Sequence, residues 1–258
     1  MNSSRQQRII EHFRRSIDSY DDGAKVQKLV GDTLIAKMAA LGDIRYDRVL
    51  EIGCCTGSMT ETLCRMKSVR ELWVNDLVSE CCYQTAERVG AVAGDIRLLA
   101  GDIERLAIPD GLDLIISSST FQWLKDLPLA FNKFATSLHD NGFLAFTMFG
   151  PGTMRQVREL IGVGLKYTSE GDLEEMLKRN FSLVEIETSC CTLYFQNARE
   201  VLRHIQATGV GGAGAYHWTP GKLRAFEHDY RLQFGTKKGV SLDYVSTCVI
   251  ARKGQGVR

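Results

Sequence analysis

The feature that most constrains the fold is the stretch at residues 48–57, which reads RVLEIGCCTG. Apolar residues run directly into a turn bounded by Gly53 and Gly57, and the polar residues 56–62 that follow favour the start of a helix. A glycine can adopt a positive φ and lets a ligand lie against the backbone, while the N–H groups of a helix N-terminus offer hydrogen-bond donors. The stretch therefore predicts a strand, a tight turn and a helix N-terminus, an arrangement that binds nucleotides or nucleotide-like cofactors.

The rest of the chain suits an α/β architecture. A length of 258 residues and a hydrophobic share of 44% are enough for one large domain with a sizeable core. From Tyr46 onward, apolar runs alternate with helical stretches, among them a helix with an apolar stripe at residues 127–138. This alternation predicts a doubly wound, mostly parallel sheet of seven strands. The strands are expected at residues 48–52, 71–75, 97–100, 113–118, 142–148, about 183–195 and about 242–252.

Two kinds of helical addition surround the predicted sheet. Residues 1–45 contain two helical runs, the second at about 26–41, and we expect an N-terminal helical lid there; plain packing on the outside of the domain is the alternative. The main domain then covers residues 46–258. Some forty-six residues separate its last two strands, far more than a hairpin needs. We therefore expect helical cap insertions at about 153–180 and 196–239.

Composition excludes several classes of protein. Lys and Arg total 32 against 31 Asp and Glu, a net charge of +1, so the chain lacks the basic footprint of a general nucleic-acid binder. It also lacks a signal-peptide core and any apolar run of about 18 residues, which predicts a soluble cytoplasmic protein without a membrane partner. Six of the eight cysteines form adjacent pairs, a spacing that fits neither metal knuckles nor a disulfide framework. We expect reduced, mostly buried thiols and no metal; a redox switch at Cys54 and Cys55 is the alternative.

Two aspartates follow predicted strands at the positions where a nucleoside would be held. Asp76 ends the second strand, nineteen residues after Gly57, and a carboxylate there can accept hydrogen bonds from both ribose hydroxyls. Asp102 follows the third strand and can accept from an adenine amino group, while Ile103 covers the ring. Asp95 has the same local sequence but falls in the approach to that strand. A solvated turn is the alternative for Asp76.

Together these segments resemble the successive motifs of class I S-adenosylmethionine-dependent methyltransferases over residues 46–150. The segments are the glycine turn, Val74–Asn75–Asp76, Gly101–Asp102–Ile103 and the run LDLIIS at 112–117. The resemblance implies S-adenosylmethionine as cofactor, bound by Glu51, Gly53, Cys55, Gly57, Asp76, Leu77, Asp102, Ile103 and Ser118. Cys55 departs from the family, which has a glycine there, and a side chain is accommodated if φ is negative.

A nicotinamide-dependent oxidoreductase is the rival interpretation, because it also combines a glycine turn with a distal acid. Its fingerprint GxGxxG is absent, since the turn reads GCCTG with glycine only at its two ends. The Asp-Ile pair after the third strand fits the methyltransferase pattern better.

Further segments resemble the malonyl-acyl-carrier-protein O-methyltransferases of biotin synthesis over most of the chain. They are STFQWL at 119–124, GFLAFTMFGPGT at 142–153, residues 13–20 and LRHIQATG at 202–209. This resemblance implies methyl transfer from S-adenosylmethionine to the free carboxylate of a malonyl thioester on an acyl carrier protein, giving the methyl ester that primes pimelate building and leaving S-adenosylhomocysteine. A methyltransferase for another small acid or small-molecule acceptor and a non-catalytic binding protein are the alternatives.

The implied chemistry needs no general base, because a malonyl carboxylate is already ionised near neutral pH. It needs a residue that binds this carboxylate, and Arg203 is the candidate, with Arg155 and Arg158 as substitutes. Gln122 and Tyr20 would orient the same carboxylate. It also needs aromatic surface near the sulfonium, for which Phe121, Trp123 and Tyr20 are available. Most helix arginines are merely solvated, which is the alternative for Arg203.

An acidic carrier protein requires a basic docking patch. Two groups of cations are candidates for this patch: Arg5, Arg8, Arg14 and Arg15 near the N-terminus, and Lys222, Arg224, Lys237 and Lys238 downstream. The alternative is that these charges only make helix faces soluble and bind no partner.

Overall fold

A computed structural model describes residues 3–42, 45–208 and 216–255, with side chains from residue 6 onward. Its internal contacts divide the chain into two compact units. Unit 1 comprises Met1–Val26, Phe149–Tyr167 and Ser189–Ser246, and unit 2 comprises Gln27–Met148, Thr168–Thr188 and Thr247–Arg258. The division separates the two predicted lid helices, because the first belongs to unit 1 and most of the second belongs to unit 2.

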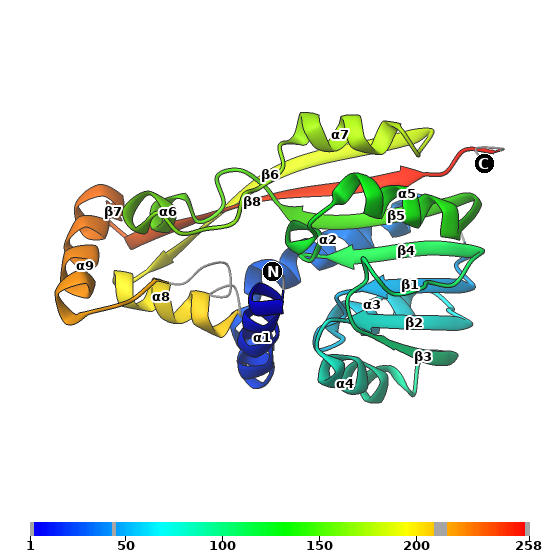
Figure 1. Ribbon diagram of the computed structural model, residues 1–258, viewed down its shortest axis with the longest axis horizontal. Coiled ribbons are helices and arrows are strands. Elements are labelled where there is room, and N and C mark those ends of the chain that lie inside the picture. The colour runs from blue at the N-terminus through cyan, green and yellow to red at the C-terminus, as the bar shows by residue number, and fades with distance from the viewer. Residues whose placement is uncertain (1–2, 43–44, 209–215, 256–258) are drawn as a thin grey trace. The chain divides into compact units, whose positions relative to one another are not determined.

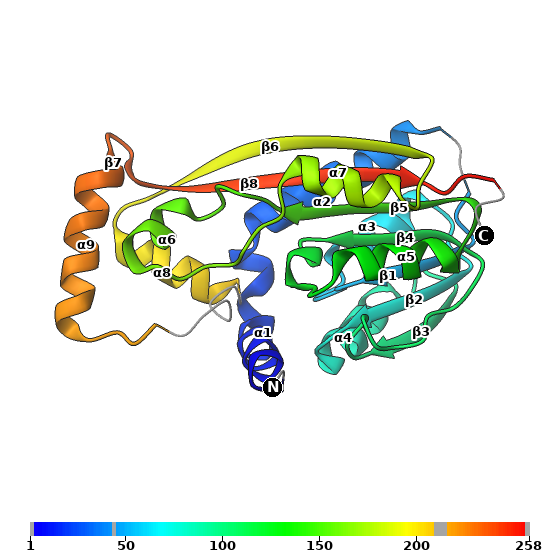
Figure 2. The same ribbon diagram turned by 45° about the horizontal axis from the view of Figure 1, so that its top comes forward.

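Unit 2 carries the parallel part of the sheet. Strands β1 (Arg48–Ile52), β2 (Glu71–Asp76), β3 (Asp95–Ala100), β4 (Leu112–Ser118) and β5 (Leu138–Phe149) alternate with α3 (Ser58–Met66), α4 (Ser79–Val89) and α5 (Leu127–Ser137). The strand order is β3-β2-β1-β4-β5-β8-β6, and each neighbouring pair from β3 to β5 is parallel (Figures 1 and 2). Strands β6 (Leu183–Phe195) and β8 (Gly239–Arg252) have residues in both units.

Alternating side chains of these strands fill two separate cores, one on each face of the sheet. Leu50, Ile52 and Ile115 pack with α5 and with α7 (Glu170–Lys178). Val49 and Leu114, one residue out of step, pack with α3, α4 and α2 (Lys25–Ala40). Helices therefore cover both faces, which confirms the doubly wound α/β fold predicted from the strand pattern.

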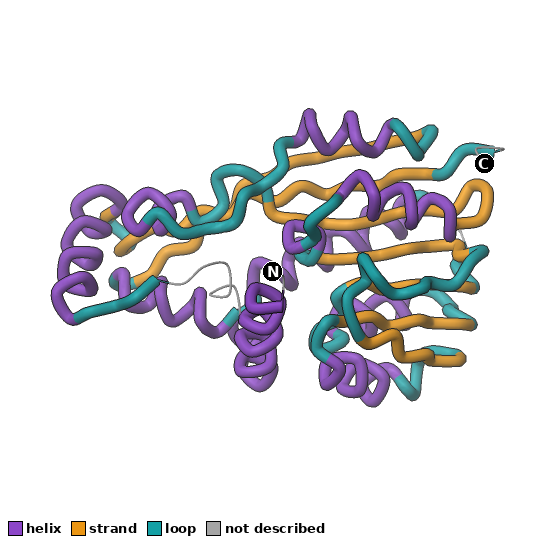
Figure 3. The backbone as a smooth tube through the Cα atoms, in the orientation of Figure 1, coloured by secondary structure: helices purple, strands orange, loops and turns teal. Residues whose placement is uncertain are grey.

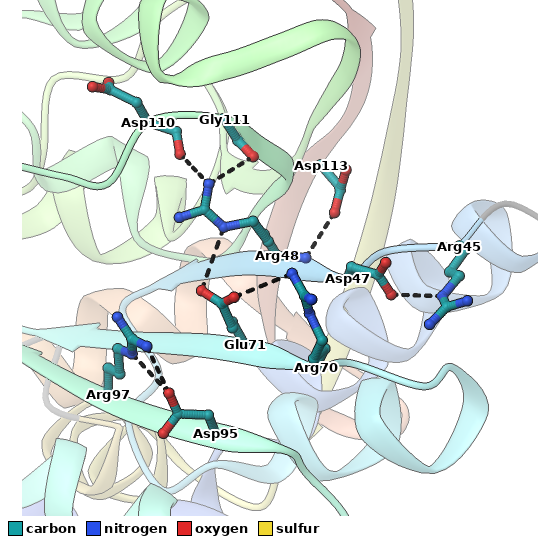
Figure 4. A network of polar contacts seen from close by, with 10 residues as sticks. All are labelled: Arg45, Asp47, Arg48, Arg70, Glu71, Asp95, Arg97, Asp110, Gly111 and Asp113. Carbon is teal, nitrogen blue, oxygen red and sulfur yellow. Dashed lines mark hydrogen bonds and ion pairs between the residues drawn. The ribbon is translucent and has the colours of Figure 1, made fainter.

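A polar network ties the strands together where they begin (Figure 4). The backbone N–H of Arg48 donates to Asp113 over 2.7 Å, and its guanidinium donates to the carbonyl of Asp110 over 2.5 Å and meets Glu71 at 3.4 Å. Arg48 and Arg97 each lie 5.2 Å from the Trp73 ring centre. These contacts hold β1, β2 and β4 at their amino ends, so that their carboxyl ends meet at a common edge.

Unit 1 contains the helices α1 (Ser3–Gly23), α6 (Arg155–Ile161), α8 (Ala198–Ala207) and α9 (Pro220–Phe234), and the two-residue strand β7 (Gly235–Thr236). Figure 3 shows the helices in purple. The Phe-Gly-Pro-Gly-Thr segment fastens to β8. Gly150 N–H donates to the Val245 carbonyl over 2.9 Å, and the Thr153 hydroxyl accepts from Val245 N–H over 3.0 Å. This motif therefore anchors the chain that leads from β5 into α6.

The predicted strands all exist, and five of the seven have bounds that differ from the predicted ones by one to four residues. The third begins at Asp95, so Asp95 pairs with Glu71 rather than preceding the strand. The fifth begins at Leu138, because α5 ends at Ser137 and the extended chain passes through Asn141 at φ 67° before the core segment. Within the predicted cap at 153–180, α7 buries Leu173 and Leu177 in the sheet core, so this part of the segment is a packing helix.

All eight cysteines are free thiols, four of them buried, and Cys190 is exposed. The expectation of mostly buried thiols is therefore right for only half of them. No helix in the described part of the chain carries an apolar stretch long enough to cross a membrane.

Candidate cofactor site

The glycine turn leaves β1 and is held by β2. Gly53 and Cys54 both donate their N–H groups to the Asn75 carbonyl, over 2.8 and 2.9 Å, and Gly57 N–H closes the turn on the Cys54 carbonyl over 2.9 Å. Gly53 and Gly57 have φ values of 76° and 80°. A Cβ at Gly53 would lie 2.0 Å from the Thr120 hydroxyl oxygen. Glycine is therefore required at Gly53 by both its backbone conformation and its closeness to the loop after β4.

Cys55 lies at the centre of the turn with φ 50°, so the negative φ under which a side chain would be accommodated is not present. A non-glycine residue in the left-handed region is disfavoured by about 1–2 kcal/mol. Three contacts hold it there. Its N–H donates to Asp76 Oδ2 over 3.0 Å, its carbonyl accepts from the Thr85 hydroxyl over 3.2 Å, and its thiol hydrogen-bonds with Cys81 of α4. Burial and this bond raise the pKa of Cys55, which weakens the redox-switch alternative because the thiolate is the reactive form.

Asp76 joins the second strand to the turn. Its Oδ2 accepts from Cys55 N–H, and its Oδ1 accepts from Val78 N–H over 2.9 Å. Burial raises the pKa of Asp76 to about 6, although the backbone donors oppose the rise. The group is thus a carboxylate at neutral pH, at the carboxyl end of β2, and it can accept from the two hydroxyls of a ribose.

Glu51 is 1% exposed, and its Oε2 has no hydrogen-bond partner among the described residues. Burial raises its pKa to about 8, and the charge of Asp76 adds to the rise. A buried carboxyl with one unpartnered oxygen, beside the predicted ribose acid, fits a cofactor that brings its own positive charge and donors, as S-adenosylmethionine does.

The loop after β3 is built around Asp102. Its Oδ1 accepts from Glu104 N–H over 3.0 Å, and the backbone of Gly101 donates to the Asp76 carbonyl over 2.8 Å. The two predicted nucleoside-binding acids thus belong to neighbouring, hydrogen-bonded segments. Ile103 is 4% exposed and packed in the core, so only a small part of its side chain is left to cover an adenine ring.

Two residues that hold this site were not predicted from the sequence. Asn75 accepts the turn through its carbonyl and donates its amide to the carbonyls of Leu99 and Gly101, over 2.6 and 3.1 Å. Lys133 of α5 donates to the carbonyls of Ile103 and Leu106, over 2.6 and 2.5 Å. The only sequence signal for Asn75 was its place inside the Val-Asn-Asp motif; Lys133 had none.

The loop after β4 places the third group of candidates. Ser118 shares a hydrogen bond of 2.9 Å with Thr147, and Gln122 donates its amide to the Ser119 carbonyl over 2.5 Å. Trp123 is partly exposed, whereas Phe121 is completely buried and stacks on Phe134 at 5.5 Å. Phe121 is therefore a core residue, and its expected contact with a sulfonium is wrong.

The remaining substrate candidates lie in unit 1. Tyr20 is a partly exposed residue of α1, and Arg203 is an exposed residue of α8. Arg155 is ion-paired with Glu159 at 3.3 Å and Asp243 at 3.6 Å, which makes it a poor substitute for Arg203. Tyr20 and Arg203 belong to unit 1, and Gln122 and Trp123 belong to unit 2, so their joint action on a substrate stays a prediction.

His204 follows Arg203 and faces inward. Its Nε2 shares a 2.7 Å hydrogen bond with the hydroxyl of Tyr244, which is 1% exposed. Burial lowers the pKa of His204, with a contribution from Lys25, and burial raises the pKa of Tyr244. Both groups are neutral near pH 7 and serve packing. Within the described residues, no group of three or more His, Cys, Asp or Glu side chains is arranged to hold a metal ion.

Comparisons with known proteins agree with this geometry. A family model described as "Methyltransferase domain" matches residues 50–146. The chain is 34% identical over 252 residues to a malonyl-[acyl-carrier protein] O-methyltransferase of Chlorobium luteolum, covering 96% of this chain and 95% of that protein. It is 37% identical to the protein of that name from Chlorobium phaeovibrioides, covering 94% and 95%.

Among solved structures, the YcgJ protein of Bacillus subtilis matches with a TM-score of 0.64 at 16% identity. The match covers 87% of this chain and 100% of that one, and at this identity it supports the fold alone.

Proposed function

The chain belongs to the family of malonyl-[acyl-carrier protein] O-methyltransferases, and from this premise we propose that it methylates the free carboxylate of a malonyl group held on an acyl carrier protein. S-adenosylmethionine supplies an electrophilic methyl group, and the products are the malonyl methyl ester and S-adenosylhomocysteine. We further propose that this ester primes the pimeloyl chain of biotin. The observation that carries the cofactor assignment is the 3.0 Å bond from Cys55 N–H to Asp76, which ties the glycine turn to the ribose acid.

In this proposal, different residues of unit 2 bind different parts of the cofactor. We assign the ribose hydroxyls to Asp76, the adenine amino group to Asp102, and the positively charged end to Glu51, whose buried Oε2 lacks a partner among the described residues. Gly53, Cys55, Gly57, Leu77, Ile103 and Ser118 would line the same site. A carboxylate at Asp76 accepts hydroxyl donors best, so binding should weaken as the pH falls through its pKa of about 6.

The acceptor needs positioning rather than proton transfer. Because its carboxylate is already ionised, no residue needs to remove a proton from it, and the buried His204–Tyr244 pair takes no part in the proposed step. We propose that Arg203 grips the carboxylate through its planar guanidinium and that Tyr20, Gln122 and Trp123 orient it. The packing of α1 on α8 supports a shared role for Tyr20 and Arg203. A Cβ at Gly23 would lie 3.1 Å from that of Ala207, and each candidate lies one helical turn from this contact.

Mass spectrometry of malonyl-loaded carrier protein, incubated with enzyme and S-adenosylmethionine, tests the proposal. We expect the carrier-bound malonyl group to gain one methyl group and the signal to disappear after ester hydrolysis. No gain on the carrier, together with methylation of free malonate, would end the carrier-protein assignment in favour of a small-acid methyltransferase. Absence of any measurable cofactor binding would favour a non-catalytic protein.

The proposal requires no metal, nucleic acid or membrane partner, and it places the enzyme in the cytoplasm with its carrier. These points stay predictions. Loss of methyl transfer after dialysis against a chelator, restored by a divalent cation, would contradict the first of them.

A further inference from the structure

The charge of the chain is divided unequally between its two units. The segments of unit 1 carry 15 Lys and Arg residues against 9 Asp and Glu, whereas those of unit 2 carry 17 against 22. The net charge of +1 for the whole chain therefore combines an excess of six positive charges in unit 1 with an excess of five negative charges in unit 2. An acidic partner is therefore attracted by the charges of unit 1, although the net charge of the whole chain is close to zero.

The cations of the two units also differ in their partners. In unit 2, most arginines are neutralised by a nearby acid: Arg45, Arg48, Arg65, Arg70, Arg88, Arg97 and Arg105. In unit 1, Arg203, Arg224, Arg231 and Lys237 are exposed and form no ion pair with any residue that the structure describes. Unpaired, solvated cations leave an attractive field for an acidic surface.

Helix α9 places two of these cations, Arg224 and Arg231, on one side. Arg224, His228 and Arg231 follow at spacings of four and three, which places them on one face of the helix. Phe226 and Tyr230, at 4% and 0% exposure, mark the opposite, buried face. The acids of the helix lie between these faces, and Glu227 is ion-paired with Arg199 of α8. The outward face of α9 therefore carries Arg224 and Arg231 without an acid between them.

Apolar groups are exposed beside the cations. Leu232 is 75% exposed on the outward side of α9, and Tyr194 of β6 is 46% exposed with the Lys238 ammonium 5.0 Å from its ring centre. The turn with Lys237 and Lys238 is held by β7, where Lys238 N–H donates to the Thr236 hydroxyl over 3.1 Å. Exposed aliphatic and aromatic groups among cations are typical of a protein-binding surface.

We propose that the outward face of α9, continued by the β7–β8 turn, is the docking surface for the acidic carrier protein. Its residues are Arg224, His228, Arg231, Leu232, Lys237 and Lys238. The proposal rests on the proposed function, because it takes a carrier-bound malonyl group as the substrate. It also decides between the two basic groups expected from the sequence. The four arginines of α1 alternate with Glu11, Asp18, Asp21 and Asp22, so that helix has no net charge; the side chain of Arg5 lies outside the described residues.

The test compares charge reversals in the two units. The double variant Arg224→Glu, Arg231→Glu is expected to raise the KM for malonyl carrier protein roughly tenfold at low salt, with kcat unchanged. Its turnover of malonyl-N-acetylcysteamine, a thioester without a carrier, should equal that of the wild type. Arg179→Glu is the matched control, because Arg179 is exposed in unit 2 and forms no ion pair with a described residue.

Salt and a second variant separate docking from general effects. The effect of the double variant should vanish at high salt, because exposed charges are screened. Leu232→Ser should raise the same KM at every salt concentration, because it removes an apolar contact without adding a charge, and an apolar contact is not screened. An unchanged KM in both variants, an equal rise in Arg179→Glu, or a loss of turnover on the carrier-free thioester would overturn the docking surface. Failure of the wild type to methylate either thioester would instead overturn the proposed function.

Discussion

The glycine turn of unit 2 and the α8–α9 pair of unit 1 both depend on polar side chains, but these side chains are used differently. At the turn, the polar groups hydrogen-bond with other groups of the protein. Asp76 accepts two backbone N–H groups, and Asn75 bonds the glycine turn, β3 and the loop after β3. On α8 and α9, Arg203, Arg224 and Arg231 make no ion pair with any described residue. The first region is preorganised, as a small-ligand site would require, and the second leaves exposed side chains, as the proposed docking of a large partner would require. Local sequence specifies the first far more closely than the second.

The largest difference should appear when a Cβ is added to a glycine of positive φ in each unit, Gly53 in unit 2 and Gly162 at the end of α6 in unit 1. Gly53→Ala must accommodate φ 76° and an atom 2.0 Å from the Thr120 hydroxyl, so we expect a loss of about 3 kcal/mol or more in unfolding free energy. Gly162→Ala in unit 1 is the control, because Gly162 has φ 67° but no atom within 4 Å of the added Cβ. It should lose only about 1 kcal/mol in denaturant unfolding. Equal losses would mean that backbone conformation alone, and not the contact with Thr120, makes the turn intolerant.

Removing the ribose acid should break cofactor binding without breaking the fold. Asp76→Ala deletes the acceptor of Cys55 N–H and of the ribose hydroxyls, and we expect the Kd for S-adenosylmethionine to rise by roughly 30- to 100-fold, about 2–3 kcal/mol. Titration calorimetry measures this change. Asp95→Ala, at the opposite end of the neighbouring strand, is the control and should bind like the wild type, because among the described residues Asp95 is ion-paired with Arg97 alone. Undiminished binding in Asp76→Ala would contradict the cofactor site itself.

The buried carboxyl of Glu51 makes stability depend on pH in a direction opposite to that of an ion-paired acid. Its folded pKa is about 8 against an ordinary value of 4.5, so the folded chain holds a proton that the unfolded chain has released. The free energy of unfolding should therefore fall as the pH rises from 6 to 8. The slope due to Glu51 is at most about 1.4 kcal/mol per pH unit, and it is reached where Glu51 is protonated in the folded chain and ionised in the unfolded chain. Glu51→Gln should remove that part of the slope. Denaturant unfolding of both proteins at pH 6, 7 and 8 measures the difference, and parallel pH profiles would place the proton elsewhere.

The two regions also differ in how far the sequence could predict them. Asp76 and Asp102 could be placed because each depends on one strand, one spacing and one turn. The roles of Asn75, Thr120 and Lys133 depend on which strands and helices become neighbours, which no single segment contains. Phe121 was misassigned because an aromatic residue beside a ligand loop and one in the core have the same sequence neighbourhood. The grip of Arg203 on a carboxylate remains a prediction, since nothing local to α8 distinguishes a binding arginine from a solvated one.

The smallest expected effect concerns Cys55, where the sequence pattern located the turn but misjudged its backbone. Replacement by glycine relieves the φ of 50° but loses the thiol contact with Cys81, whereas replacement by alanine loses the same contact and keeps the strain. Cys55→Gly should therefore be more stable than Cys55→Ala by about 1 kcal/mol, net of the greater freedom of glycine in the unfolded chain.

Denaturant unfolding of the two Cys55 variants measures this difference with the thiol absent from both. Cofactor affinity should change less than about threefold in either, because the backbone N–H that meets Asp76 is retained. If the two variants are equally stable, the left-handed backbone is not strained. The departure from glycine would then be neutral for folding, and the turn would be held by its hydrogen bonds with Asn75, Asp76 and Thr85.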